Sequence, residues 1–387
     1  MIRSFRYIFK TIVSVFAFIP FLVSCSRQEM PALNDDMSLF AFIISDNNLD
    51  DHTDYVEYDL VQGLKGCPVG TELFLYIDRR NEVPTLRHLF LLDTGHVGVR
   101  TIAKYQEQCS TSPTVFKDIL LTMKEHSSGR RYGLIYWSHG SGWMPGLANS
   151  SPTRALGADG MYSMDVDDMH NILSETKIPL FIVLDACFMG SVEVAYSLRS
   201  STDYLIASPG ETLGIGFPYH LMIPELIKGT EESMKRSLDR FLDYCYTDYY
   251  GDGTISGMAS LTDCSQMDSL AAAFRNIITE YPVKKNLNSI QVYDCSTPHI
   301  YFDLWDYANS IATDSMSLKV FGNQLERTVL HKVTTPFLFT QTSGKDSLIA
   351  VDSYSGLSTY IPGSSGPYDQ LYTLTGWYKD CYDTGKE

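Results

Sequence analysis

The segment IPLFIVLDAC, residues 178–187, is an apolar run that stops at Asp185 and Cys187. An uninterrupted apolar run of this length is typical of a strand buried on both faces of a parallel sheet. The segment YGLIYWSHG, residues 132–140, has the same form and stops at His139. Ligands of open parallel sheets bind beyond the carboxyl ends of the strands. We therefore expect His139 and Cys187 to share one rim, provided that the two strands are neighbours.

Strands and helices alternate on both sides of these two segments. Short apolar runs predict further strands over residues 39–44, 72–78, 87–93 and 203–208. Apolar residues at helical spacing predict helices over residues 56–64, 113–126, 166–173 and 191–199. This alternation predicts an α/β fold in which a mostly parallel sheet is sandwiched by helices.

The pattern changes after residue 229. Amphipathic helices are expected over residues 231–246, 265–279 and 302–311, with strands over 328–333 and 348–352. We therefore divide the chain at residue 229. Residues 37–229 form the main α/β domain in this prediction, and residues 230–387 form a smaller α+β accessory portion.

The N-terminus has the pattern of an export signal. Basic residues precede an apolar run over residues 11–23, which is too short for an ordinary membrane span. The run ends in LVSC at Cys25, which resembles a bacterial lipobox. This resemblance implies a lipoprotein signal peptide (1–24), a lipidated Cys25, a tether (25–36) and anchoring at the outer membrane or cell surface. A plain secretory signal, with Cys25 incidental, is the alternative.

The charge balance excludes one class of partner. The formal net charge is −16, with 30 basic and 46 acidic residues among 387. Such a surface repels nucleic acid, and the sequence contains no basic patch that argues otherwise. It would attract cationic partners or calcium, although solubility alone also accounts for it. We expect a monomer.

The cysteines argue against zinc. Apart from Cys25 the sequence contains Cys67, Cys109, Cys187, Cys245, Cys264, Cys295 and Cys381. No two of them form a CxxC pair, which is the usual zinc-binding spacing. The odd number leaves at least one free thiol in an exported protein, which is compatible with a reactive cysteine.

His139 and Cys187 have the chemistry of a nucleophile and its base. A thiol has an ordinary pKa of about 8.5, so that a nearby imidazole or a helix N-terminus is needed to produce thiolate. Gly140 lets the backbone approach a substrate closely, and the amides of Gly140 and Cys187 are natural donors to an oxyanion. The alternative is a structural histidine and a core cysteine, which are the more common roles for each residue alone.

The flanking residues resemble the clostripain family of cysteine peptidases, which are relatives of caspases, gingipains and legumain. The matching blocks are SHGSGW (138–143), DACFMGSVE (185–193), SDNNLD (45–50), ASPGE (207–211) and SGLSTYIP (355–362), together with Trp377. The separation of His139 and Cys187 is close to the value of about 50 residues in caspases. The resemblance implies a caspase-like sheet and a catalytic His139–Cys187 dyad.

The resemblance also implies cleavage after Arg, with Lys as a second option. A guanidinium in a pocket needs a carboxylate partner, ideally a bidentate one. In relatives an acid two residues before the cysteine lies near the pocket floor, which here is Asp185. Glu211 is a second candidate for substrate binding, with a role in capping its own loop as the alternative.

Family members often mature by cutting themselves between the histidine and cysteine blocks. Arg154 lies there in the small, polar segment NSSPTRALG (149–157), a type of segment that proteases cut readily. We predict intramolecular cleavage after Arg154, with an ordinary surface arginine as the alternative. We expect no required cofactor. Some relatives depend on calcium, but Asp159, Asp165, Asp167 and Asp168 do not have EF-hand spacing.

Two other function classes compete with the peptidase. A catalytically idle lipoprotein could keep the fold to bind a surface partner, but the intact His139, Gly140, Asp185 and Cys187 argue against it. A serine hydrolase would need a Gly-x-Ser-x-Gly motif, which is absent around the candidate serines.

Overall fold

The structure is a computed structural model of the chain. It describes residues 33, 36–145, 154–160, 162–176, 179–247, 255–280, 287–312, 314–342, 345–363 and 368–383. Residues 1–24 and Cys25 lie outside these ranges, so the signal peptide and the lipid anchor stay predictions. In the part that is described, no helix combines the length and the apolar character needed to cross a membrane.

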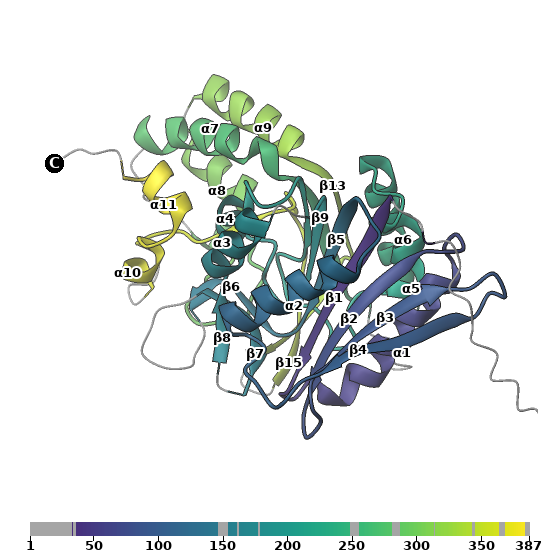
Figure 1. Cartoon of the computed structure of the whole chain (residues 1–387). Helices are drawn as coiled ribbons and strands as arrows, with labels where there is room; N and C mark the ends of the chain where they lie inside the picture. The colour runs from purple at the N-terminus through teal and green to yellow at the C-terminus, as the bar shows by residue number, and fades with distance from the viewer. Residues whose placement is uncertain are drawn as a thin grey trace, which may run out of the picture. The chain divides into compact units, whose positions relative to one another are not determined.

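Strands and helices alternate along the chain (Figure 1). The strands are β1 (Met37–Ser45), β2 (Glu72–Arg79), β3 (Thr85–Leu91), β4 (Val97–Lys104), β5 (Arg131–Trp137), β6 (Gly140–Pro145), β7 (Arg154–Asp159), β8 (Tyr162–Asp165), β9 (Phe181–Asp185), β10 (Tyr204–Ala207), β11 (Met258–Asp263), β12 (Phe302–Asp303), β13 (Val329–Thr334), β14 (Phe337–Thr342), β15 (Lys345–Ala350) and β16 (Ser358–Thr359). The helices are α1 (Asp50–Lys65), α2 (Pro113–His126), α3 (Val166–Thr176), α4 (Val192–Leu198), α5 (Tyr219–Leu226), α6 (Glu231–Cys245), α7 (Met267–Glu280), α8 (Leu304–Ile311), α9 (Ser315–Thr328), α10 (Asp369–Tyr372) and α11 (Gly376–Cys381).

The central sheet has nine strands in the order β13-β11-β10-β9-β5-β1-β2-β3-β4. The five neighbouring strands β10, β9, β5, β1 and β2 run parallel. The pairs at the two margins are antiparallel: β10 with β11 and β11 with β13 on one side, and β2 with β3 and β3 with β4 on the other. The predicted α/β fold with a mostly parallel sheet is confirmed. Parallel strands place all their carboxyl ends at the same edge, and that edge carries the candidate site.

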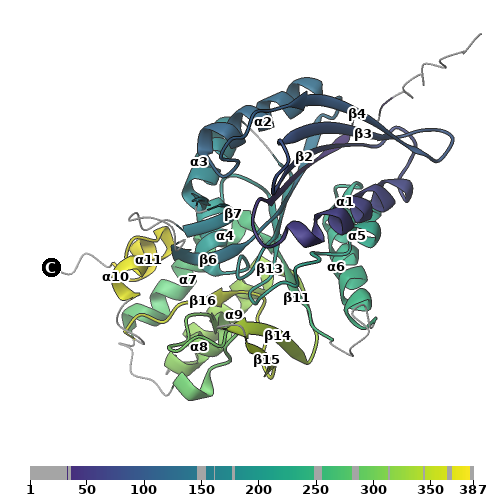
Figure 2. The ribbon, with the colours of Figure 1, turned by 90° about the horizontal axis from the view of Figure 1, so that it is seen from below.

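Side chains of the central strands alternate between two apolar cores, one on each face of the sheet. In β1, Phe40, Phe42 and Ile44 belong to one core, and Leu39, Ala41 and Ile43 belong to the other. Helices α2, α3 and α4 cover the first core, and α1, α5 and α6 cover the second (Figure 2). Because both faces are covered, the central strands read as uninterrupted apolar runs in the sequence.

The residues after 229 contribute to the same sheet. Strand β11 pairs with β10, and β13 pairs with β11, so that both extend the sheet at one margin. All described elements belong to one compact unit. The division into residues 37–229 and 230–387 therefore stays a prediction, and the second part completes the sheet of the first.

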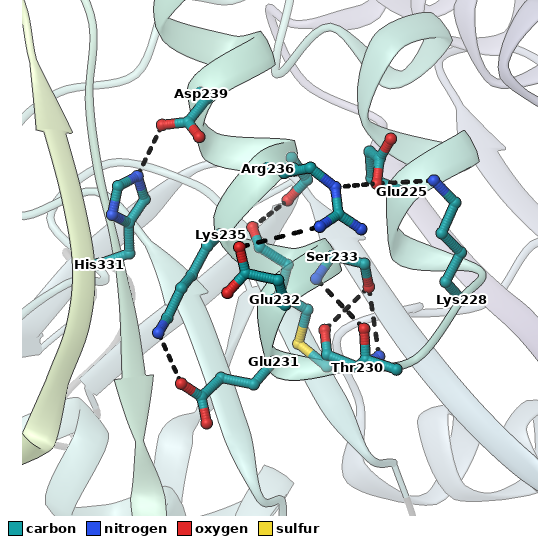
Figure 3. A network of polar contacts seen from close by, with 12 residues as sticks. Glu225, Lys228, Thr230, Glu231, Glu232, Ser233, Lys235, Arg236, Asp239 and His331 are labelled. Carbon is teal, nitrogen blue, oxygen red and sulfur yellow. Dashed lines mark hydrogen bonds and ion pairs between the residues drawn. The ribbon is translucent and has the colours of Figure 1, made fainter.

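Helix α6 closes this margin over the second core. Its N-terminus is a capping box, in which Thr230 and Ser233 each accept the other's backbone N–H at 3.2 Å. On its outer side, His331 of β13 bonds to Asp239 at 2.7 Å (Figure 3). Exposed polar contacts such as this contribute at most about 1 kcal/mol each, so burial of the apolar face of α6 holds the helix in place.

Candidate active site

The ends of β5 and β9 bring the two predicted catalytic residues to one rim. The strands are direct neighbours in parallel register, with Trp137 opposite Asp185. His139 and Cys187 each follow two residues after this pair. The condition set by the sequence analysis, that the two strands be adjacent, is therefore met.

A cleft of about 440 Å³ opens at this rim. Its walls come from the loop after β1, the ends of β5 and β9, the segment after β10, and the hairpin of β14 and β15. The lining residues are Asn48, Leu49, His52, Trp137, Ser138, His139, Asp185, Cys187, Glu211, Thr212, Leu213, Gly214, Phe339, Gln341 and Asp346. Four predicted site residues, His139, Asp185, Cys187 and Glu211, thus share one cleft.

His139 is oriented by an asparagine from the loop after β1. Its Nε2 atom donates to Oδ1 of Asn48 at 2.7 Å. An amide oxygen can only accept, so this contact places the proton on Nε2 and leaves the lone pair on Nδ1. Burial lowers the pKa of His139, which keeps the imidazole neutral and able to take a proton. The neighbouring Asn47 fixes the loop by donating from Nδ2 to the carbonyl of Ala158 at 2.6 Å.

We predict that Asn48→Ala lowers kcat for an arginyl peptide by about 10- to 100-fold with little change in KM. The expected loss is smaller than the rate acceleration of roughly 10²- to 10⁴-fold that a correctly positioned base contributes, because the variant keeps the base and loses only part of its orientation. Asn48→Asp would instead raise the pKa of His139, because a carboxylate stabilises the imidazolium, and would move the acid limb of the kcat profile to higher pH. The measurement is the pH dependence of peptide hydrolysis. Asn323→Ala, at an exposed position of α9, is the control. Equal kcat in Asn48→Ala and wild type would contradict the assignment.

Cys187 is a neutral thiol in this structure. Its Sγ atom lies 3.7 Å from both the carbonyl oxygen and the Oγ1 atom of Thr212. Burial raises the pKa of Cys187 to about 11, and the carboxyls of Glu211 and Asp185 also raise it, whereas the contacts with Thr212 lower it. A preformed thiolate is therefore disfavoured, and the thiol needs a base during attack.

The helix predicted over residues 191–199 is present as α4. Helix α4 begins at Val192, and the hydroxyl of Ser191 caps it by accepting from the N–H of Val194 at 3.3 Å. Residues 187–190, between Cys187 and this cap, form a tight turn. The helix N-terminus is thus occupied by Ser191, so it does not act directly on the thiol of Cys187.

Of the two residues predicted to form an oxyanion hole, Cys187 begins this turn and Gly140 is the first residue of β6. Within the described residues, the backbone N–H of Cys187 donates no hydrogen bond. Gly140 packs tightly against the turn, since a Cβ atom there would lie 2.8 Å from the carbonyl oxygen of Cys187. Glycine is therefore required at position 140 because its backbone packs closely against this turn. The approach of Gly140 to a substrate, which the sequence analysis expected, stays a prediction.

Asp185 is a buried carboxylate among the residues that line the cleft. Its side chain is only 1% exposed. Oδ2 accepts from the N–H of Phe217 and from the hydroxyl of Tyr219, both at 2.6 Å. Oδ1 has no hydrogen-bond partner within the described residues. Burial raises the pKa of Asp185 to about 7. A buried carboxylate oxygen without a donor is costly, so Oδ1 can accept a hydrogen bond from a further donor.

Glu211 contacts a part of the cleft wall that the sequence analysis did not connect with it. Its carboxylate accepts from the hydroxyl of Thr340 and from the N–H of Gln341, the latter at 3.0 Å. Both residues belong to β14, so Glu211 attaches the β14–β15 hairpin to the segment after β10. Both carboxylate oxygens of Glu211 have donors, whereas Oδ1 of Asp185 has none within the described residues.

Arg154 is the first residue of β7, and residues 146–153 lie outside the described ranges. The strand that follows Arg154 contacts the histidine directly. The N–H of Gly157 donates to the carbonyl of His139 at 2.8 Å, and the N–H of Ala158 donates to the hydroxyl of Ser138 at 3.1 Å. The predicted cleavage point therefore adjoins a strand that supports the catalytic rim.

The acids considered for calcium do not converge. Asp159 accepts from the N–H of Ser110, whereas Asp165 accepts from the N–H of Asp167 at 2.8 Å at the start of α3. Across the described ranges, no group of three or more His, Cys, Asp or Glu side chains is placed to hold a metal ion. These acids do not fit a cation site, and calcium binding elsewhere stays a prediction. The seven described cysteines are all free thiols.

Three functional features were missed in the sequence. Asn48 lies in a block that was quoted for its resemblance, but no role was given to it. A signal was present, because an amide directly after a buried strand is expected at the same rim as His139. His52 lies in helix α1, and the β14–β15 hairpin is not part of the central sheet, so neither follows the end of a parallel strand. Their place beside the cleft therefore had no signal in the sequence.

The comparison with known families now adds to this geometry. The model of the clostripain family (Peptidase_C11) matches residues 41–382. The chain belongs to the clostripain family. This confirms the family predicted from the sequence. Among curated relatives, clostripain of Hathewaya histolytica is 22% identical, in a match that covers 72% of this chain and 61% of that protein. The chain therefore spans less than two thirds of that relative's length.

Solved structures of the clostripain family agree with the fold. A secreted C11 cysteine protease from Bacteroides thetaiotaomicron, in complex with an irreversible peptide inhibitor, is 27% identical with a TM-score of 0.79. The match covers 90% of this chain and 99% of that one. An inactive zymogen C11 protease from Parabacteroides distasonis is also 27% identical, with a TM-score of 0.78 over 90% of this chain and 98% of that one.

Proposed function

We propose that the protein is a cysteine endopeptidase that cleaves after Arg, with Lys as a second option, and that Cys187 and His139 are its catalytic pair. Membership of the clostripain family and the shared rim of the two residues support this proposal. The observation that carries the specificity is the buried Oδ1 atom of Asp185, which has no hydrogen-bond partner among the described residues, on a residue that lines the same cleft as Cys187. A guanidinium would supply the donor that this oxygen lacks.

The reaction follows from the protonation states of the resting site. The thiol of Cys187 passes its proton to the imidazole of His139 as sulfur attacks the carbonyl carbon of the scissile bond. The N–H groups of Gly140 and Cys187 stabilise the oxyanion that develops. The imidazolium then gives its proton to the leaving amine as the C–N bond breaks. Water, deprotonated by His139, hydrolyses the thioester and restores the thiol.

The protein would be made in an inactive, uncut form. The relative from Parabacteroides distasonis is described as an inactive zymogen, which supports this reading. We propose that the active form arises by cleavage after Arg154. β7 would remain in place after the cut, because its backbone donates to the carbonyl of His139 and the hydroxyl of Ser138.

Export and anchoring complete the proposal. The relative from Bacteroides thetaiotaomicron is secreted, which supports export of this chain. We propose that Cys25 carries the lipid and holds the peptidase at the bacterial envelope. Several acyl chains on one cysteine would anchor it firmly, since each buried methylene contributes about 0.8 kcal/mol.

The test compares peptides that differ only in the residue before the scissile bond. Purified protein, intact and after limited cleavage, is assayed with arginyl, lysyl and citrullinyl fluorogenic peptides. We expect hydrolysis of the arginyl peptide at least about 100-fold faster than of the citrullinyl peptide, because citrulline keeps the shape and loses the charge. No hydrolysis by either form, together with no labelling of Cys187 by an arginyl probe, would favour the catalytically idle binding protein.

A further inference from the structure

The two catalytic segments lie against each other through their backbones. A Cβ atom at Gly140 would lie 2.8 Å from the carbonyl oxygen of Cys187. Gly142, with a φ of +52°, faces Phe188 in the same way, since its Cβ would lie 2.6 Å from the carbonyl oxygen of Phe188. The position of His139 relative to Cys187 thus depends on how closely residues 139–142 and 187–189 pack.

One side chain from the C-terminal half contacts both segments. The ring of Tyr301 stacks on the ring of Phe188, with centroids 4.1 Å apart and planes 5° from parallel. Its hydroxyl donates to the carbonyl of Ser141 at 2.6 Å. Tyr301 is 2% exposed, so both contacts are shielded from water. A single buried residue therefore joins the segment after His139 to the segment after Cys187.

The contact with Phe188 acts on a strained position. Phe188 directly follows Cys187 and has a φ of +63°, in the left-handed region that residues with a Cβ atom disfavour. The bond from its N–H to the carbonyl of Gly210 at 2.9 Å and the stack with Tyr301 hold this conformation. If the stack is lost, Phe188 can relax, and Cys187 moves with it.

Tyr301 is itself held firmly. The buried carboxylate of Asp294 accepts from the backbone N–H groups of Tyr301 at 2.9 Å, Ile300 at 3.0 Å and Ser296 at 2.8 Å. Asp294 is 2% exposed. The loop that carries Tyr301 is thus fixed by charge-assisted bonds, which suits a residue that sets the position of others.

We propose that Tyr301 is a positioning residue for the reaction, which fixes the segment after Cys187 against the segment after His139. It touches neither substrate nor reacting atoms and acts through Phe188 and Ser141. The inference rests on the proposed function, because it gives Cys187 and His139 the roles of nucleophile and base. It also gives the accessory portion a role in positioning the two catalytic segments.

Two variants separate positioning from filling of the core. Tyr301→Phe keeps the stack and loses the bond to Ser141, whereas Tyr301→Leu loses both contacts. We expect kcat to fall about 5- to 20-fold in the first and about 100-fold or more in the second, with KM within twofold, since a misplacement of about 1 Å costs on the order of 10²-fold in rate. A side chain that only filled space would leave Tyr301→Phe as active as wild type.

A second readout does not need peptide hydrolysis. The rate at which iodoacetamide alkylates Cys187 is followed against pH by intact mass. We expect the midpoint of this profile to shift upward by about one pH unit in Tyr301→Leu, because the thiol loses its aligned base. If the wild-type protein fails to hydrolyse arginyl peptides, the proposed function is contradicted. The pH profile of alkylation still tests whether Tyr301 positions Cys187 relative to His139.

Tyr293→Phe is the matched control. It removes a buried tyrosine hydroxyl that donates to Asp303 at 2.7 Å and to the carbonyl of Ser353 at 3.1 Å, neither of which belongs to residues 139–142 or 187–189. We expect Tyr293→Phe to keep the wild-type kcat and the wild-type alkylation profile. All variants are compared at temperatures below their melting transitions. Folded Tyr301→Phe and Tyr301→Leu proteins with wild-type kcat and alkylation profiles would overturn the proposal. An equal loss of kcat in Tyr293→Phe would overturn it as well.

Discussion

Replacing Cys187 by alanine should abolish hydrolysis of arginyl peptides, with kcat lower by about 10⁴-fold or more. The reason is that no other group can form the covalent intermediate, and removal of a nucleophile typically leaves only the small contribution of binding and oxyanion stabilisation. His139→Gln should give a loss of similar size, because burial raises the pKa of Cys187 to about 11 and the variant removes the base that accepts the thiol proton in the proposed reaction. The measurement is the initial rate of fluorogenic peptide hydrolysis.

The same variant tests maturation. If the cut after Arg154 is made by the protein itself, Cys187→Ala should be purified as one uncut chain, whereas wild type shows a new N-terminus at Ala155. Cys295→Ala is the matched control, since Cys295 is another free and partly exposed thiol. Cys187→Ala protein that still appears as two chains would rule out self-cleavage. A Cys187→Ala protein that still hydrolyses arginyl peptides would rule out Cys187 as the nucleophile.

Replacing Asp185 by asparagine should lower kcat/KM for arginyl peptides by about 10³-fold and leave the fold intact. Loss of one partner of a buried charge pair costs about 2–5 kcal/mol in binding, and each 1.4 kcal/mol is about tenfold. Asparagine can still accept from Phe217 and Tyr219, so the pocket keeps its shape. Glu211→Gln should cost less, because Glu211 contacts the hairpin rather than an open position.

The pKa of Asp185 determines the direction in which kcat/KM for arginyl peptides changes with pH. Because burial raises the pKa of Asp185 to about 7, the carboxyl is protonated and unable to pair with a guanidinium in acid. The kcat/KM for arginyl peptides should therefore fall as pH decreases through 7, and the Asp185→Asn variant should lose that part of the profile. Since folding raises this pKa, ionised Asp185 opposes folding at high pH, and the variant should melt no earlier than wild type at pH 8. A loss of less than tenfold in Asp185→Asn would contradict the specificity assignment.

The central part of the fold could be predicted because burial on both faces leaves a clear pattern. The strands that became β1, β5 and β9 are uninterrupted apolar runs, and helix α2 was predicted with the bounds that the structure has. The marginal strands were harder. β4 is mostly exposed or half-buried and mixes polar with apolar residues, so it has no strong periodicity. β14 and β15 pair only with each other, beside the cleft.

The candidate site could be predicted to the extent that it lies at strand ends. His139, Asp185 and Cys187 follow from the carboxyl ends of β5 and β9 together with the family resemblance. The contacts of Asn48 and Tyr301 join residues that are 91 and 160 positions from their partners. The end of a buried strand places Asn48 at the same rim as His139, but neither this hydrogen bond nor the contact of Tyr301 follows from a local pattern, because both depend on how loops meet in three dimensions.

The most direct test of the account is to label the protein with an arginyl chloromethyl ketone and map the modified residue by mass spectrometry. The account predicts a single adduct on Cys187, formed far more slowly in His139→Gln and in Asp185→Asn. An adduct on another cysteine, or labelling of Cys187 at the same rate in all three proteins, would contradict it.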